Sequence, residues 1–484
     1  MGASRDSEAN GIPAAGADGD DTNGADDEDG VTIGSTIRVG QLGATAMVNV
    51  SNASTSVKLD AWVDFNADGS WSGPFEQIAD AVSVSNGNNT VRFDVPSWSI
   101  DTNTIARFRL STAGDLAPSG IEADGEVEDY IVSIRPPVTN VGTNWTPRVI
   151  TTSADGAQSV FAVDLDGDGD MDVLSASLSD RKIALYVNDG SQNFSTNIIS
   201  TDARQARAVF AADVDGDRDI DVLSASALDN KIAWYEYDGD SNFTERIIST
   251  NAIDAQSVFA ADVNRDGYMD VLSASIDDDS ITYYENDGVQ NFTINVISAG
   301  ADGAHSVFAV DVDGDGDIDV LSASNLDDTI AWYENDGNQG FTTNIVSTTA
   351  NGVRSVFATD MDGDGDMDAL SASFNSDAIA WHENDGNENF STHLISSAAD
   401  GARSVFGADV DGDGDVDVLS ASDNDGTIAW YINDGSQNFA TNIVSTTADR
   451  AHSVFAADVD GDGDLDVLSA SRVDDKITWY ELGP

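Results

Sequence analysis

The chain has 484 residues, no cysteine and a formal net charge of −66, because 87 acidic residues stand against 21 Lys and Arg. Phosphate contacts need a basic surface, so this charge excludes nucleic acid as an expected partner. No apolar run is long enough to span a membrane, and residues 1–10 lack the layout of a signal peptide.

Residues 1–30 are poor in hydrophobic residues and rich in Gly, Ala and Asp, and they end in Asp26-Asp27-Glu28-Asp29-Gly30. A segment of this composition cannot bury enough apolar surface to fold, which indicates a disordered acidic linker. Because the chain begins inside a linker, we expect it to be part of a longer multidomain protein with a leader upstream.

Residues 31–136 contain short alternating apolar and polar runs separated by turn residues, which favours an all-β sandwich. Pro136-Pro137 then marks a linker over residues 137–142. The clearest strand-like runs are residues 36–39, 58–63, 90–93 and 106–110.

One loop of this domain has the character of a metal site. Residues 64–71 read Asp-Phe-Asn-Ala-Asp-Gly-Ser-Trp, with Glu76 following. Alternate oxygen-bearing side chains around a glycine turn are ligands that Ca²⁺ prefers. We therefore expect one Ca²⁺ here, held by Asp64, Asn66, Asp68 and Glu76.

Residues 143–484 hold an acidic loop that occurs seven times, and each copy begins 49 residues after the last. A fixed period of this length indicates an array or a propeller. Each unit has four strand-like runs, which is the content of a propeller blade, and seven blades fall within the usual range. In the fourth unit the runs are residues 306–310, 319–324, 329–334 and 342–347.

The two ends of the repeat region complement each other. The last unit stops after Leu482 without its fourth run, whereas residues 144–150, before the first unit, resemble the fourth run at residues 193–199. An open stack would need neither feature, and closure removes exposed sheet edges. The sequence thus predicts an all-β protein with a seven-bladed β-propeller, closed by an N-terminal strand in the last blade and preceded by a β-sandwich domain.

The loops read Asp-x-Asp-Gly-Asp-Gly-Asp-x-Asp with few changes, and positions one, three, five and nine offer side-chain oxygens to one Ca²⁺. The alternative is an acidic β-turn without an ion. The second loop is the weakest candidate, because Arg218 stands where the others have glycine. The predicted ligands are Asp164, Asp166, Asp168 and Asp172; Asp213, Asp215, Asp217 and Asp221; Asp262, Asn264, Asp266 and Asp270; Asp311, Asp313, Asp315 and Asp319; Asp360, Asp362, Asp364 and Asp368; Asp409, Asp411, Asp413 and Asp417; and Asp458, Asp460, Asp462 and Asp466.

Polar or basic residues recur near the start of the first run of each unit, which must lie at the face opposite the acidic loops. If these side chains point into the funnel, they form an anion-attracting site for an acidic glycan or a carboxylate-bearing partner. Alternatively, they are solvated strand starts that pair with nearby aspartates. They are Gln158, Arg207, Gln256, His305, Arg354, Arg403 and His452.

The third run of most units carries a tryptophan, with Leu185 and Tyr283 as substitutes. This pattern favours packing between blades over stacking on sugars. The recurring Asn-Asp-Gly is typical of a hairpin turn rather than of a site.

The repeated Ser-Val-Phe-Ala-Ala-Asp-Val-Asp-Gly-Asp-Gly-Asp-x-Asp-Val-Leu-Ser-Ala-Ser resembles the FG-GAP/VCBS repeat, which forms integrin-α-type propellers, over residues 143–484. Ser-Ala-Ser stands where the integrin type has Gly-Ala-Pro, which favours the bacterial branch. Residues 31–136 resemble the GEVED domain of secreted bacterial proteins, through Gly125-Glu126-Val127-Glu128-Asp129-Tyr130 and Trp62-Val63-Asp64-Phe65-Asn66. The resemblance implies an extracellular or cell-surface location and a role in binding or adhesion.

No nucleophile elbow, zinc motif or phosphate loop is visible, and the near-equal blades favour no single catalytic blade, so we expect no enzyme. The expected function is a calcium-binding, non-catalytic adhesion or ligand-binding module, monomeric, with a protein or glycan ligand at the face opposite the acidic loops. The alternatives are a multivalent lectin and, less favoured, a polysaccharide lyase that would use His305 or His452, which no tyrosine accompanies.

Overall fold

The computed structural model of the protein describes residues 30–483, apart from residues 35, 52, 54–56, 115, 119–125, 141, 240 and 388. All regular elements in this part of the chain are β-strands, as the sequence predicts. No helix of the described residues has the length and apolarity that crossing a membrane requires. The predicted acidic linker over residues 1–30 lies, except for Gly30, outside the described residues.

The N-terminal domain consists of two sheets with a shared core, the arrangement of a sandwich. Val48, Leu59 and Phe108 are fully buried in it. The three-stranded sheet has the order β1 (Val31–Ile33), β3 (Ala44–Val50), β6 (Gly87–Phe93); the five-stranded sheet has the order β2 (Ile37–Arg38), β8 (Glu126–Arg135), β7 (Asn103–Ser111), β4 (Val57–Val63), β5 (Gln77–Val84).

The rest of the described chain forms seven four-stranded antiparallel sheets, the repeated unit of a β-propeller. In order, the sheets are β10 (Ala157–Val163), β11 (Asp172–Ser177), β12 (Lys182–Asn188), β13 (Phe194–Ser200); β14 (Ala206–Ala212), β15 (Asp221–Ser226), β16 (Lys231–Tyr237), β17 (Phe243–Ser249); β18 (Ala255–Ala261), β19 (Asp270–Ser275), β20 (Ser280–Asn286), β21 (Phe292–Ser298); β22 (Ala304–Val310), β23 (Asp319–Ser324), β24 (Thr329–Asn335), β25 (Phe341–Ser347); β26 (Val353–Thr359), β27 (Asp368–Ser373), β28 (Ala378–Asn384), β29 (Phe390–Ser396); β30 (Ala402–Ala408), β31 (Asp417–Ser422), β32 (Thr427–Asn433), β33 (Phe439–Ser445); and β34 (Ala451–Ala457), β35 (Asp466–Ser471), β36 (Lys476–Gly483), β9 (Asn144–Thr151).

Burial within each sheet follows the residue types of its strands. The second strand, Asp-Val-Leu-Ser-Ala-Ser in most copies, is buried along its whole length, as β23 shows. The fourth strand is more exposed than the second, and its threonines suit an edge that faces water, as the exposed Thr342 and Thr343 of β25 show.

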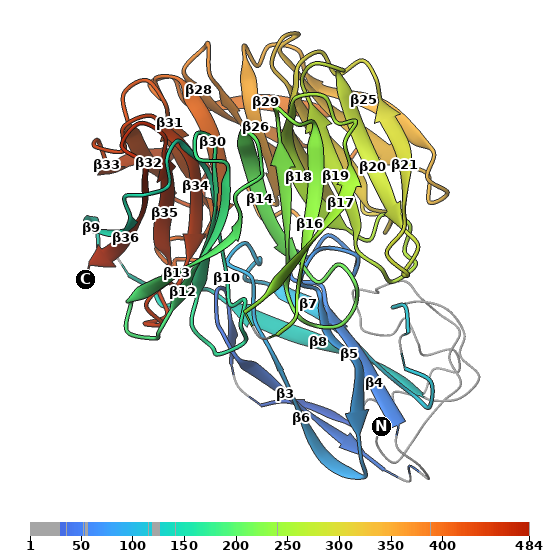
Figure 1. Cartoon of the computed structure of the whole chain (residues 1–484). Coiled ribbons are helices and arrows are strands. Elements are labelled where there is room, and N and C mark those ends of the chain that lie inside the picture. The colour runs from blue at the N-terminus through green and yellow to red at the C-terminus, as the bar shows by residue number, and fades with distance from the viewer. Residues whose placement is uncertain are drawn as a thin grey trace.

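The last sheet takes its fourth strand from the region before the first repeat. β9 pairs antiparallel with β36, with Thr146 opposite Glu481 and Val149 opposite Thr478, and the two strands lie side by side in Figure 1. This pairing agrees with the prediction that residues 144–150 supply the missing strand.

A phenylalanine from the first strand of each sheet packs against its counterpart in the next sheet. Ring centroids of successive phenylalanines are 4.7 to 5.0 Å apart, and the contact between Phe455 and Phe161 joins the last sheet to the first. A second series joins the same strands: a serine hydroxyl accepts the amide of a valine in the next sheet, as Ser453 does from Val160 at 3.3 Å.

The N-terminal domain lies against the side of the repeats that carries the acidic loops (Figure 1). Ser97 Oγ donates to the carbonyl of Ala456 at 2.6 Å, and the Trp98 ring lies 6.2 Å from that of Phe455 and 6.3 Å from that of Phe161. Trp98 therefore covers the end of the phenylalanine series on this side.

Candidate metal sites and the channel cavity

Each acidic loop turns around its first aspartate. In the first loop, the carboxylate of Asp164 accepts the amides of Asp168 at 3.1 Å and of Gly169 at 2.8 Å. Gly167 and Gly169 have φ of 72° and 95°, a region that suits glycine. The backbone thus folds back and leaves the remaining carboxylate oxygens on the inside of the turn.

In each of the four loops named below, the turn brings three of the four predicted ligands together; Asp168, Asp217, Asp319 and Asp364 are not part of these groups. In each group below, one carboxylate oxygen per residue lies within 4.8 Å of the others. Six to eight oxygens, several of them from carboxylates, are the donors that suit Ca²⁺, so these groups fit the ion that the sequence predicts. The groups are Asp164, Asp166 and Asp172; Asp213, Asp215 and Asp221; Asp311, Asp313 and Asp315; and Asp360, Asp362 and Asp368.

When no cation is bound, burial raises the free energy of the ionised form of these carboxylates. It raises the pKa of Asp213 to about 7 and that of Asp221 to about 8. Asp215 and Asp217 add repulsion to the Asp213 carboxylate. A bound divalent cation relieves both the desolvation and the repulsion.

The ninth aspartate of each loop has a second role that the sequence interpretation missed. Oδ2 of Asp319 accepts the amide of Val312 at 3.1 Å and the indole Nε1 of Trp332 at 2.8 Å, and its Oδ1 accepts the amide of Asn335 at 2.7 Å. This aspartate therefore fastens the loop to the second and third strands. Trp332 is fully buried, which confirms that the tryptophan packs rather than faces a ligand.

The asparagine of Asn-Asp-Gly also does more than form a turn. Asn335 is buried, and its Nδ2 donates to Ile318 O of its own loop at 3.0 Å and to Val263 O of the preceding sheet's loop at 3.2 Å. It thereby couples neighbouring acidic loops. The repetition of this asparagine at the end of the third strand is the sequence feature that could have predicted this contact between loops.

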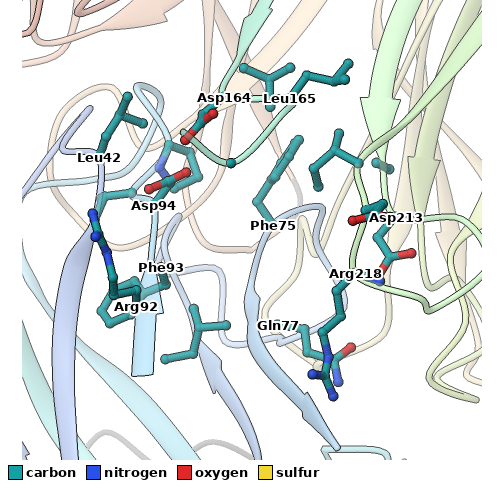
Figure 2. A pocket seen from close by; sticks show the side chains of 18 of the residues that line it. Leu42, Phe75, Gln77, Arg92, Phe93, Asp94, Asp164, Leu165, Asp213 and Arg218 are labelled. Atoms are coloured by element: carbon teal, nitrogen blue, oxygen red, sulfur yellow. The ribbon is translucent and has the colours of Figure 1, made fainter. Parts of the chain in front are cut away.

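Loops two and three each place an arginine where most loops have glycine. Arg218 and Arg265 have φ of 79° and 58°, and Asp213 still accepts the Arg218 amide at 2.9 Å. Figure 2 shows the Arg218 side chain extending toward Gln77 and away from Asp213. Its guanidinium therefore does not lie beside the carboxylates of its own loop.

A large cavity of about 640 Å³ separates the N-terminal domain from the first acidic loops (Figure 2). Phe75 and Phe93 line it from the N-terminal domain, and Leu165 lines it from the first loop. Arg92 and Arg218 add positive charge at its wall.

The candidate site of the N-terminal domain is buried. Asp64, Asp68 and Glu76 are 4%, 6% and 2% exposed, and oxygens of the three lie within 4.8 Å of one another. Asn66 Nδ2 donates to Asp68 Oδ2 at 2.9 Å. The structure therefore brings together the three acids that the sequence proposes for this ion. The fourth predicted ligand, Asn66, turns its Nδ2 toward Asp68 and accepts the Asp68 amide with its Oδ1.

The seven polar or basic residues near the start of the first strands line one cavity of about 160 Å³, at the end of the strands opposite the acidic loops. Nη1 of Arg207 donates to Gln158 Oε1 at 3.0 Å, and His452 Nδ1 lies 3.1 Å from the same oxygen. His305 Nδ1 lies 2.9 Å from the carbonyl of Arg354.

Three arginines meet at this cavity, and their charges repel. Burial and the neighbouring Arg354 lower the pKa of Arg403 to about 9. Nε of Arg207 and Nε of Arg354 are buried without a hydrogen-bond partner. Asp423 lies 3.8 Å from Arg403 Nη1, and Asp254 attracts Arg207. The cavity thus has a positively charged lining.

Comparison with known families agrees with this geometry. The family model of the FG-GAP-like repeat matches residues 164–224, 213–273, 269–322, 311–371, 360–420 and 409–469. These matches reach from the first acidic loop to the seventh and cover more than half of the chain. The model of the GEVED domain matches residues 58–133.

No curated protein matches the chain. Among solved structures, BBS1N in complex with ARL6DN is 10% identical with a TM-score of 0.50, and the match covers 71% of this chain and 98% of that one. An auxiliary nutrient binding protein from Bacteroides ovatus is 10% identical with a TM-score of 0.41, covering 94% of this chain and 99% of that one. The likeness to BBS1N is one of fold alone.

Proposed function

The chain belongs to the FG-GAP-like repeat family and carries a GEVED domain, and from this premise we propose that it is a calcium-binding, non-catalytic module that binds an anionic ligand outside the cell. FG-GAP-like repeats typically occur in extracellular proteins, which supports this location.

We propose that the seven sheets are the blades of one closed propeller. The strand that β9 adds to the last sheet supports closure, as do the contact between Phe455 and Phe161 and the bond from Val160 N to Ser453 Oγ. A closed ring leaves only short, protected sheet edges.

The donor atoms of the acidic loops favour bound Ca²⁺ over an acidic turn without an ion. Their donors are carboxylates and carbonyls, which suit a hard cation, and no cysteine is available for a softer metal. Bound Ca²⁺ would neutralise the carboxylates of the loops. The ninth aspartate, which also bonds to the strands, would then hold the loop and the strands in a fixed arrangement. The chain's own residues would then hold about one ion for each of the seven loops and one in the N-terminal domain.

The observation that carries the ligand proposal is the convergence of Arg207, Arg354 and Arg403 on one cavity in a protein of net charge −66. Asp423 offsets part of the repulsion among these arginines, and a bound anion would offset more of it. The cavity of about 160 Å³ is smaller than a usual small-molecule pocket, so it suits one carboxylate or sulfate group of a larger ligand.

The two histidines of the cavity are uncharged at neutral pH. Burial lowers the pKa of His452 to about 3, and burial together with Arg403 lowers that of His305 well below its usual range. Neither is a general acid at neutral pH. None of the described residues that line this cavity is a tyrosine.

An array of acidic and neutral glycans and of acidic and neutral peptides, probed in Ca²⁺, tests the ligand proposal. We expect acidic members to bind, and Arg354→Gln to weaken that binding at least tenfold. Arg246→Gln is the matched control, because Arg246 pairs with Glu236 on an outer strand far from the cavity lining.

Binding to acidic glycans would make the protein a lectin, and binding to acidic peptides would make it a protein-adhesion module. Binding that ignores ligand charge, or that Arg354→Gln leaves unchanged, would contradict the proposed ligand face.

A further inference from the structure

Residues 64–76, which connect β4 to β5, carry both the buried acidic cluster and polar contacts to the repeats. Asp68 Oδ2 accepts the amide of Asp311 at 3.3 Å. The carbonyl of Ser72 accepts the amide of Asp262 at 2.9 Å. Asp311 and Asp262 are the first aspartates of two acidic loops, so this segment touches the repeats at their own candidate ion sites.

The same segment carries an aromatic contact. The Phe75 ring lies 5.7 Å from the ring of Trp98 and 6.5 Å from that of Phe161, at the end of the phenylalanine series. Phe75 has φ of 66°, which is strained for a residue with a bulky side chain. Its chain neighbour is Glu76, one of the three clustered acids, so whatever fixes Glu76 also fixes Phe75.

The cluster itself points to a cation. Asp64, Asp68 and Glu76 are buried with oxygens within 4.8 Å of one another. Asp64 Oδ2 accepts the amide of Gly69 at 3.2 Å, whereas its Oδ1 is buried and has no hydrogen-bond partner. Native proteins rarely leave such an oxygen unsatisfied unless an ion or water binds it.

We propose that a Ca²⁺ held by Asp64, Asp68 and Glu76 keeps the N-terminal domain docked on the acidic-loop face of the repeats. The inference rests on the proposed calcium binding and adds a function for one ion. With the ion bound, the segment keeps the shape that presents Asp68, Ser72 and Phe75 to the repeats. Without it, three buried carboxylates repel, the segment opens, and these contacts are lost together.

Docking also sets the cavity of Figure 2, because Phe75 lines it from the segment while Asp164 and Asp213 line it from the repeats. Release of the N-terminal domain would open this cavity to solvent and uncover Phe161. Calcium concentration would thereby control access to the acidic-loop face.

Distance measurements between spin labels on the full-length chain test the proposal. The chain has no cysteine, so Ser85→Cys in the N-terminal domain and Thr244→Cys on β17 give two specific attachment points, both exposed. We expect a narrow distance distribution in Ca²⁺ and a broad one in chelator.

Two substitutions separate this ion from those of the repeats. Glu76→Gln weakens one ligand at little change of size, and we expect it to raise the Ca²⁺ concentration at half-docking at least tenfold. Asp362→Asn is the control, since Asp362 belongs to a loop group made only of repeat residues. We expect it to leave the docking midpoint within twofold of the unsubstituted chain.

Equilibrium dialysis on the same samples distinguishes the failures. Bound Ca²⁺ without any change of the distance distribution, or equal midpoint shifts in Glu76→Gln and Asp362→Asn, would overturn the docking inference and leave the proposed calcium binding intact. Absence of bound Ca²⁺ would overturn both.

Discussion

At the scale of single residues, the buried Asp60 of β4 gives a pH dependence that is separate from the ion sites. Burial raises its pKa from 3.8 to about 6, although Oδ1 accepts the Ala81 amide at 2.7 Å. A raised carboxyl pKa means that the folded state favours the protonated form. The N-terminal domain therefore loses stability as the pH rises from about 4 to about 6.

Asp60→Asn keeps the acceptor for Ala81 and removes the ionisation. We expect the N-terminal domain of this variant to be more stable by about 1–2 kcal/mol at pH 7.5 and unchanged near pH 4. Urea unfolding in Ca²⁺ at both pH values measures the difference. Asp155→Asn, at an exposed position of the repeats, is the control. Equal effects of Asp60→Asn on stability at the two pH values would contradict the raised pKa of Asp60.

The residue scale also shows what the sequence could and could not predict. The spacing of the acidic loops was enough to bring Asp164, Asp166 and Asp172 together, because glycines at fixed positions force one local turn. The bond from Asn335 to Val263 O depends instead on how neighbouring sheets pack. Local patterns predict local geometry, and contacts between sheets need the assembled fold.

At the scale of elements, strand boundaries followed from the pattern closely. The four runs expected in the fourth unit appear as β22 to β25 with ends shifted by at most two residues. The N-terminal domain's position was not predictable, because the contact between Trp98 and Phe455 joins surfaces that no repeat or motif links.

The strand β9 gives the sharpest prediction at this scale. A chain that starts at residue 137 keeps β9, whereas one that starts at residue 152 leaves β36 with an unpaired edge. We expect the longer chain to be monomeric. The shorter chain should associate through β36 and melt at a lower temperature.

Light scattering after size exclusion, together with thermal unfolding, compares the two chains. The contact between Trp145 and Trp430, with centroids 5.7 Å apart, is lost only in the shorter one. Equal mass and equal melting temperature would mean that β9 does not complete the last sheet in solution.

At the scale of the whole molecule, the main feature is the distribution of charged residues. The net charge is −66, and the N-terminal domain covers part of the face that carries the acidic loops through Asp68, Ser72 and Trp98. The opposite end gathers Arg207, Arg354 and Arg403. The molecule therefore has carboxylate clusters at one face and a group of arginines at the opposite end, joined by strands that the ninth aspartates anchor.

The proposed calcium binding is tested most directly by two measurements on the full-length chain. Equilibrium dialysis gives the number of bound Ca²⁺ ions, and thermal unfolding in Ca²⁺ and in chelator gives their effect on stability. We predict about seven to eight bound ions and a melting temperature that falls sharply in chelator, since ions that bind only the folded state stabilise it. An unchanged melting temperature in chelator, with no bound Ca²⁺, would contradict the account.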